Sequence, residues 1–169
     1  MTANANALLT AMGSTSTDLE ANRQGKLSQA QIERMKHKRQ RDTLIAAALF
    51  CGLALGATIL FYMGQLNRSV ILSGAGATLT FINAIMVGRA GRAYMRVGGD
   101  MRGGQVEVLA GEVERVLRRG RANDNYLLRI NGAELYVSKD VFTGFRHKAS
   151  YRIYRTGISR VLLSAEPAS

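Results

Sequence analysis

The chain has 169 residues, one cysteine, two histidines and a formal charge of +11. A single cysteine excludes an intrachain disulfide and a cysteine-based zinc site. Cys51 lies in an apolar run that does not favour a thiolate, while His37 and His147 stand apart without spaced carboxylates. We therefore predict no metal site and no bound cofactor.

Two short helices are predicted in the polar N-terminal segment. The pattern Thr17–Glu20 is typical of a capping box that begins a helix, and Gly25 suits the left-handed position that ends one. Ser28 and Gln31 form a second capping box, so the next helix is expected to begin near Gln29.

Residues 1–42 are expected to form a cytoplasmic arm carrying these helices. No Pro or Gly interrupts the second helix before Gly52. It either continues into the following apolar run as a projecting rod or breaks at Asp42–Thr43 and lies along the membrane. We favour the rod, because a surface helix needs a larger apolar face. Residues 1–16 are expected to be mobile unless they order against a partner.

Two apolar runs without charged residues follow, at 43–65 and 69–88, separated by Leu66–Arg68. A helix of about 20 residues spans the roughly 30 Å hydrocarbon core of a bilayer. The sequence therefore predicts a membrane α-helical hairpin of two transmembrane helices over residues 43–88.

Basic residues flank the open end of this hairpin, whereas its connecting loop holds only Arg68. Because basic residues near membrane spans stay in the cytoplasm, we expect a multi-pass protein of a bacterial inner (plasma) membrane with both termini cytoplasmic. Anionic lipid headgroups are the expected partners of this basic flank. The residues concerned are Lys36, Lys38, Arg39, Arg41, Arg89, Arg92 and Arg96.

Small residues repeat every four positions in both runs, a spacing that lets helix backbones approach closely. These helix-packing candidates are Ala48, Gly52 and Gly56 in the first run and Ser69, Ser73 and Ala77 in the second. The two stripes either pack against each other within one hairpin or form a homo-oligomeric interface. Asp, Glu, Lys and His, which are typical of transport pathways within the membrane, are absent from both runs. An oligomeric pore lined by hydroxyl groups remains an alternative.

A basic, glycine-rich connector is predicted at residues 89–104, followed by a cytoplasmic β domain at 105–166. The dipeptide Asn131–Gly132 predicts a two-residue hairpin turn. In that register the apolar residues of both strands share one face, and Arg129 opposes Glu134 on the other. The opposed apolar pairs are Ile130 with Ala133, Leu128 with Leu135 and Tyr126 with Val137.

Further strands are expected at Gln105–Leu117 with a bend at Gly111, at Tyr151–Arg155 and at Ser159–Ser164. Ser138 is expected to cap one helical turn before the last two strands. Five strands in so short a segment indicate a small, partly closed antiparallel barrel of the oligonucleotide-binding (OB) or SH3-like kind, in which closure hides the sheet edges.

The sequence contains no phosphate-binding loop, nucleophile elbow or zinc-protease motif, and the spacing of Ser159, Ser164 and His147 supports no catalytic set. We predict no catalytic residue and a non-enzymatic protein. A candidate partner surface consists of Arg118, Arg119, Arg121, Arg152, Tyr154 and Arg155. Nucleic acid is an unlikely partner, because the glutamates of this domain dilute its positive field.

The segments Tyr151–Tyr154 and Leu162–Pro167 resemble the closing segment of uncharacterised bacterial membrane proteins in which two spans precede a small β domain, and Asn22–Gln31 resembles their N-terminal lead-in. The layout is also similar to that of NfeD-type membrane proteins. Those likenesses imply a membrane-anchored barrel that mediates protein association, with no assigned activity.

The function predicted from the sequence is a membrane-anchored interaction or assembly module that presents the β domain to a protein partner. The alternative is an oligomeric small channel or transporter accessory subunit. A third reading is a membrane-tethered barrel that binds nucleic acid.

Overall fold

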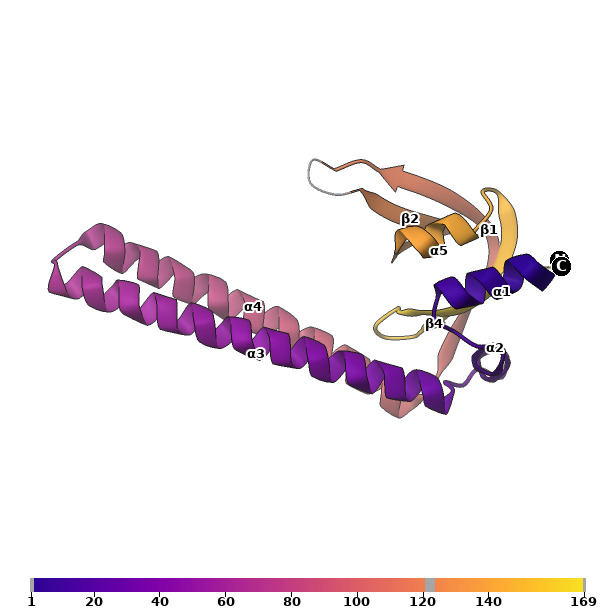
Figure 1. The fold of residues 1–169 in the computed structure, drawn as a ribbon, viewed down its shortest axis with the longest axis horizontal. Helices are drawn as coiled ribbons and strands as arrows, with labels where there is room; N and C mark the ends of the chain where they lie inside the picture. Colours follow the sequence, from indigo (N-terminus) through magenta and orange to yellow (C-terminus); the bar gives the residue numbers. More distant parts are fainter. Residues whose placement is uncertain (1, 121–123, 169) are drawn as a thin grey trace. The chain divides into compact units, whose positions relative to one another are not determined.

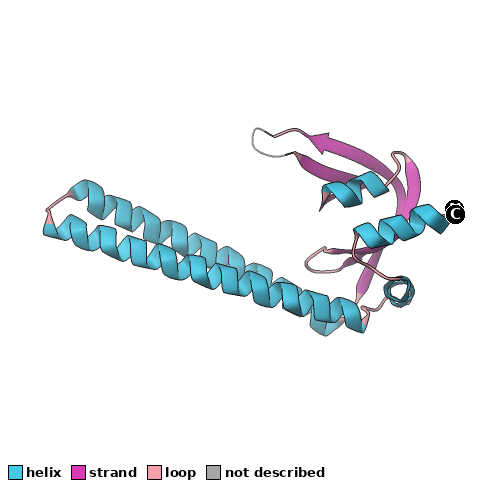
Figure 2. Ribbon diagram, in the orientation of Figure 1, coloured by secondary structure: helices cyan, strands magenta, loops and turns pink. Residues whose placement is uncertain are grey.

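A computed structural model describes residues 2–120 and 124–168 of the chain (Figures 1 and 2). The chain divides into two compact units, Arg34–Gly99 and a second formed by Met1–Glu33 together with Asp100–Ser169. We call these the helical unit and the β unit. The helices are α1 (Thr2–Ala11), α2 (Ser16–Arg23), α3 (Gln29–Leu66), α4 (Val70–Gly103) and α5 (Lys139–Gly144); the strands are β1 (Val106–Arg118), β2 (Asn125–Ile130), β3 (Ala133–Val137), β4 (Ala149–Thr156) and β5 (Leu162–Pro167).

The two long helices α3 and α4 are apolar enough over 18-residue windows to cross a membrane. Only 6% of the window in α3 and 11% of that in α4 is buried, unlike the core helix of a water-soluble protein. The Ser28 and Gln31 capping box is confirmed, with main-chain to side-chain hydrogen bonds of 3.1 Å in both directions. From Gln29 the helix continues without a break at Asp42–Thr43, as in the predicted rod.

The segment expected to be a glycine-rich connector, residues 89–104, is helical through Gly103. Each glycine costs a helix about 1 kcal/mol relative to alanine, a penalty that packing of one helix against another outweighs. The Arg39 guanidinium of α3 lies 3.5 Å from the centre of the Tyr94 ring of α4, inside the expected connector. Gly104 follows the last helical residue, and its φ of +60° suits the position after a helix terminus.

The five strands form one antiparallel sheet in the order β3-β2-β1-β4-β5. The predicted hairpin is confirmed in its register, from Ile130 opposite Ala133 to Tyr126 opposite Val137. Asn131 and Gly132 both have positive φ, as a type I′ turn requires. The long strand β1 pairs with β4 through its first part and with β2 through its last part.

The sheet is open in the described residues, so the partial closure into a barrel that the sequence predicted is not found: β3 and β5 are edge strands. The reason lies in the N-terminal segment, which covers part of the sheet that closure was expected to hide. The Ser14 hydroxyl donates a hydrogen bond to the Leu163 carbonyl of β5, so this segment crosses the β5 edge.

The core of the β unit lies on one face of the sheet, under α1 and α5. It includes Leu128, Phe145 and Ile153, and the Leu8 side chain of α1 is inserted among them at 1% exposure. Residues 1–16 were expected to be mobile without a partner; in the structure the β sheet itself supplies the apolar surface that α1 needs. A Cβ at Gly144 would lie 2.8 Å from a Leu8 methyl group, so α5 approaches Leu8 closely.

Candidate functional site

The two long helices contact each other closely at residues spaced by seven along α3. A Cβ built at Gly64 would lie 2.5 Å from the Ser73 nitrogen of α4, and one at Gly76 would lie 3.0 Å from the Ala57 carbonyl oxygen of α3. The Asn83 amide donates a 3.3 Å hydrogen bond to the Phe50 carbonyl. The α3 contacts at 50, 57 and 64 follow the heptad spacing typical of helices packed at a small angle.

Only some of the six predicted helix-packing residues lie at the contact between α3 and α4. Ser73 lies in the interface against Gly64, and a Cβ at Gly56 would reach Leu79 of α4 at 3.6 Å. Ser69 accepts a 3.4 Å hydrogen bond from the Leu72 amide at the start of α4. The other three, Ala48, Gly52 and Ala77, are exposed, and a Cβ at Gly52 would meet nothing within 4 Å.

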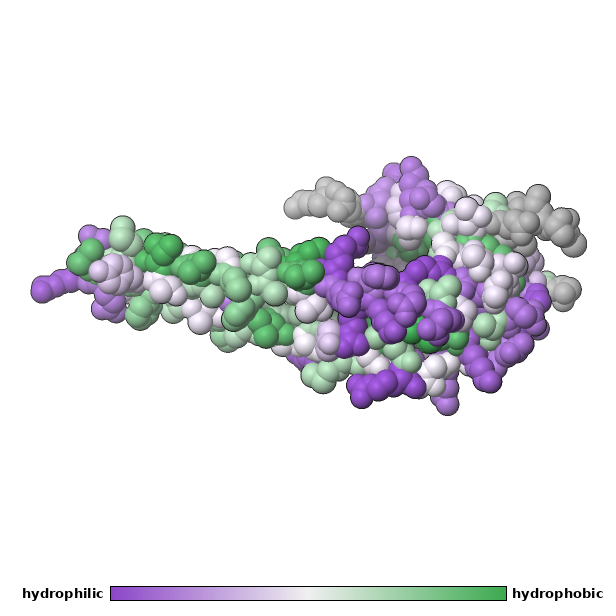
Figure 3. Space-filling view, turned by 60° about the horizontal axis from the view of Figure 1, so that its bottom comes forward, coloured by the Kyte–Doolittle hydropathy of each residue, from purple (hydrophilic) through white to green (hydrophobic). Residues whose placement is uncertain are grey.

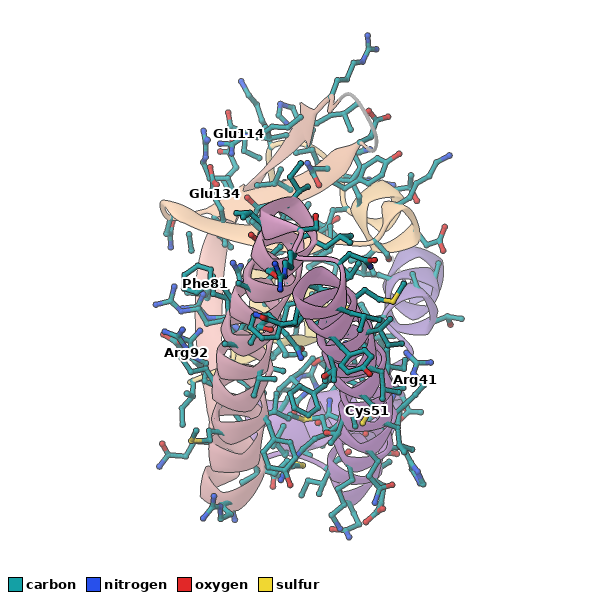
Figure 4. The ribbon with its side chains drawn as sticks, turned by 90° about the vertical axis from the view of Figure 1, so that its left-hand side faces the viewer. Arg41, Cys51, Phe81, Arg92, Glu114 and Glu134 are labelled. Atoms are coloured by element: carbon teal, nitrogen blue, oxygen red, sulfur yellow. The ribbon has the colours of Figure 1, made fainter. Side chains whose placement is uncertain are left out.

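Large apolar side chains cover the outside of the helix pair. Val70 is 85% exposed, Phe81 68% and Leu55 65%. The apolar colouring along both helices in Figure 3 shows this surface, and Figure 4 shows Phe81 directed outward from α4. Because small residues lie between the helices and large ones outside, this surface suits an apolar solvent better than water.

The predicted basic flank forms a belt on both helices. Six of its seven residues are exposed, and Arg39 is half-buried over the Tyr94 ring. Figure 4 shows Arg41 and Arg92 on opposite sides of the helix pair. The helical unit holds nine lysine and arginine residues against the single acidic residue Asp42. The charges surround the helices rather than converge on one pocket, an arrangement that suits a layer of headgroups.

The start of α3 and the end of α4 are anchored within the β unit. Asp100, only 4% exposed, accepts hydrogen bonds of 2.8 and 2.7 Å from the main-chain amides of Ile158 and Ser159 in the β4–β5 turn. The Leu27 amide bonds to the Gly104 carbonyl at 3.1 Å. The chain entering α3 and the chain leaving α4 are therefore tied together.

A buried polar cluster fixes α2 against α3 and against the sheet. The Asp18 carboxylate accepts from the Thr15 amide at 2.9 Å and also from the Ser28 hydroxyl. Thr15 rather than Thr17 is the capping residue, so α2 begins earlier than predicted. The fully buried Asn22 donates a 2.7 Å hydrogen bond to the Ser164 hydroxyl of β5. This cluster joins the chain entering α3 to the last strand.

Part of the predicted partner surface is covered. Tyr154 is 1% exposed, because the last part of β4 is buried on both faces, and its hydroxyl donates a 2.8 Å hydrogen bond to Glu166. Arg155 is also buried and pairs with Glu107 at 2.9 Å. Arg152 is exposed and lies 3.5 Å from a Glu166 oxygen. On the second face the Asn22 side chain of α2 binds Ser164 of β5, the residue paired with Tyr154.

Glu166 is the centre of an ion-pair cluster on this second face. Burial by itself raises the pKa of its carboxyl, but hydrogen bonds from Arg23 and Tyr154 and the nearby charges of Arg23 and Arg152 hold the pKa below the usual range. Burial, and then the hydrogen bond to Glu166, raises the pKa of Tyr154.

The remaining partner-surface candidates lie near the other end of the sheet. Arg118 is exposed and pairs with Glu134 at 3.1 Å, and Arg129 bridges Glu134 and Glu114. Figure 4 shows these two glutamates close together. Arg119 is exposed at the end of β1, and Arg121 lies outside the described residues. The structure thus separates Arg118 and Arg119 from Arg152, Tyr154 and Arg155, since they lie at opposite parts of β1 and its neighbours.

The structure does not assemble Ser159, Ser164 and His147 into one site. Ser159 shares a hydrogen bond with Thr156, Ser164 is bound by Asn22, and His147 accepts from the Arg115 amide at 3.1 Å. Within residues 2–120 and 124–168, no group of three or more His, Cys, Asp or Glu side chains is placed to hold a metal ion.

Comparisons with models of protein families, with curated proteins and with solved structures found no match to this chain. The resemblances noted in the sequence therefore remain expectations.

Several structurally important residues were missed by sequence reasoning. Asp100 was hidden in an apparent linker, and Gly64 and Gly76 lay outside the four-residue stripes. A heptad count from Phe50 would have found the α3 positions. Leu8 lay in a segment without a strong helix signal, although Leu8, Leu9 and Met12 have helical spacing.

Proposed function

We propose that this protein is a membrane-anchored, non-enzymatic interaction module that holds a protein partner beside the bilayer. In this proposal α3 and α4 cross a bacterial inner membrane, and both termini and the β unit lie in the cytoplasm. The observation that carries it is the outward-facing apolar surface of α3 and α4, on helices whose ends are tied into a folded β unit. Anionic headgroups bind the basic belt.

Membrane crossing can be tested by cysteine labelling in a Cys51→Ala background. A cysteine at Asn67 and one at Lys139 are compared in intact cells treated with a membrane-impermeant maleimide. Labelling of Asn67→Cys alone agrees with the proposed topology. Equal labelling of both positions, or release of the protein from membranes by alkaline carbonate, contradicts it.

The partner is tested by isolating the tagged full-length chain from gently solubilised native membranes. The expected result is a complex with another protein at fixed stoichiometry. A pure homo-oligomer would instead favour the alternative function, a small channel or transporter accessory subunit.

One observation favours that alternative specifically. The hairpin does not use Ala48 or Gly52, so these small residues face outward from α3. Gly52→Leu leaves the contacts within one hairpin untouched and should disperse a detergent-stable oligomer if one exists. An oligomer unchanged in size would count against this second function.

Nucleic-acid binding is weakly supported. Arg118, Arg129 and Arg155 are each paired with a carboxylate, which reduces the positive field available to phosphates. Nucleic acid that copurifies at moderate salt would restore this third reading.

A further inference from the structure

We propose that the open edge of β3 is a docking site for an extended segment of another polypeptide, which adds to the sheet as a further strand. This inference rests on the proposed function, because it names the surface by which the module holds its partner. Strand addition to a sheet edge is a recurring mode of peptide recognition.

The main-chain hydrogen-bonding groups of β3 alternate in direction. Because the Asn131–Gly132 turn has two residues, Ala133, Leu135 and Val137 exchange hydrogen bonds with β2. The amide and carbonyl groups of Glu134 and Tyr136 then point away from the sheet, and no hydrogen bond from the described residues reaches their main chain. An extended main chain satisfies both pairs of groups at once.

A row of apolar side chains ends at this edge with an exposed tyrosine. Val116, Leu127 and Tyr136 lie opposite one another on the face of the sheet away from the main core. Leu127, in the middle of the row, is 1% exposed, whereas Tyr136 at its end is 68% exposed. A side chain from an added strand would continue the row and cover the Tyr136 ring.

The two edge strands of the sheet, β3 and β5, differ in how far other segments cover them. The N-terminal segment crosses β5 at Ser14, and α2 and α1 lie on the two faces beside it, since Ser164 contacts Asn22 while Ala165 packs in the core with Leu8. In the described part of the chain no comparable segment crosses β3. The β3 edge is therefore open to an added strand, whereas the Leu163 carbonyl on the β5 edge is already bound.

The neighbouring side chains define the chemistry of the occupant. The charge of Glu134 is already balanced by Arg118 and Arg129, so a partner segment needs no charged residue to bind this edge. Residues of the added strand that lie opposite Leu135 and Val137 would extend the apolar face of the core. The residue opposite Tyr136 would extend the row of Leu127 and Tyr136 on the other face. The partner segment is therefore uncharged at its centre and rich in β-branched and aromatic residues.

The test uses the purified full-length chain in nanodiscs and a synthetic extended peptide of threonine, valine and tyrosine with lysine at both ends. Binding is measured by fluorescence anisotropy and located by amide hydrogen exchange. Slower exchange at Glu134 and Tyr136 is expected. A matched peptide with N-methyl groups at alternate amides should not bind, because it cannot pair with the edge.

Two variants separate the main chain of Tyr136 from its side chain. Tyr136→Pro removes an outward amide without removing a bond to β2, and should weaken peptide binding about tenfold or more. Tyr136→Ala keeps the amide and should have a smaller effect. Hydrogen exchange at Leu128 checks that the β2–β3 hairpin is intact in both.

Equal binding by Tyr136→Pro and the wild type would overturn the inference, as would peptide protection confined to another surface. Pairing of β3 with β3 of a second copy, detected as a crosslinked homodimer through Tyr136→Cys, would also overturn it. If the native partner copurifies undiminished with Tyr136→Pro, only this inference fails. If no protein copurifies with the wild-type chain, the proposed function fails.

Discussion

The helical unit and the β unit place the same kinds of side chain in opposite positions. In the β unit Leu128 and Ile153 have no exposed surface, whereas in the helical unit Val70 and Phe81 are among the most exposed residues. Between α3 and α4 lie Gly64, Gly76 and the polar Asn83 instead. A water-soluble domain is driven together by burial of large apolar groups, but helices in lipid associate through close contact and hydrogen bonds.

The charges follow the same division. Most of the net positive charge belongs to the helical unit, where Asp42 is the only acidic residue. In the β unit arginines and glutamates pair across strands, as in Arg129 with Glu114 and Glu134. The difference shows that the high net charge of the chain is a property of its helix flanks.

The largest expected effect tests whether α1 belongs to the β unit. Leu8→Ala leaves a cavity among the core side chains and should lower the free energy of unfolding by about 2–5 kcal/mol. Thermal unfolding in detergent, followed by tyrosine circular dichroism, measures the change. Leu117→Ala, at a half-exposed site, is the control; equal effects of the two variants would contradict the placement of α1.

The helical unit is tested by Gly64→Leu, where the added side chain meets the Ser73 backbone. Overpacking of this kind costs about 1–3 kcal/mol, because the backbone of α4 has to move. The distance between spin labels on α3 and α4 should increase. Gly52→Leu is matched in residue type and should change nothing within the hairpin; separation of the helices in both variants would contradict the contact described.

The connection of α4 to the β4–β5 turn is tested by Asp100→Ala. The two main-chain amides of this turn lose their buried carboxylate acceptor, which costs about 1–3 kcal/mol. Faster hydrogen exchange is expected at Ile158 and Ser159. The exposed Asp140→Ala serves as the control, and unchanged exchange in Asp100→Ala would show that the turn is ordered by other contacts.

The smallest effect concerns the ion-pair cluster of the β unit. Since the folded-state pKa of Glu166 lies below the ordinary 4.5, its contribution is present above that pH and is lost as the pH falls through the folded value. Glu166→Gln should cost about 1 kcal/mol near neutral pH and flatten this acid dependence. Parallel pH profiles for the variant and the wild type would contradict the role of Glu166.

Much of the local structure could be predicted from the sequence. The Asn131–Gly132 turn sets the register of β2 and β3 because only one alignment puts the apolar residues on one face. The Ser28 cap fixes the start of α3, and the length of the uncharged runs fixes two long apolar helices. Each of these features depends on residues close together in the chain.

Only the tertiary structure decided how distant segments meet. In the structure Leu8 lies in the core, and Tyr154 is buried on the face of β4 opposite the main core. The β3 edge is open, where partial closure was predicted. The helix α4 also stays helical through its glycines. These outcomes depend on packing between segments far apart in sequence, which overrides local propensity and leaves no periodic signal in the chain. The sequence by itself therefore determined the local elements and the apolar character of the two long helices, and long-range packing determined which surfaces remain available for binding.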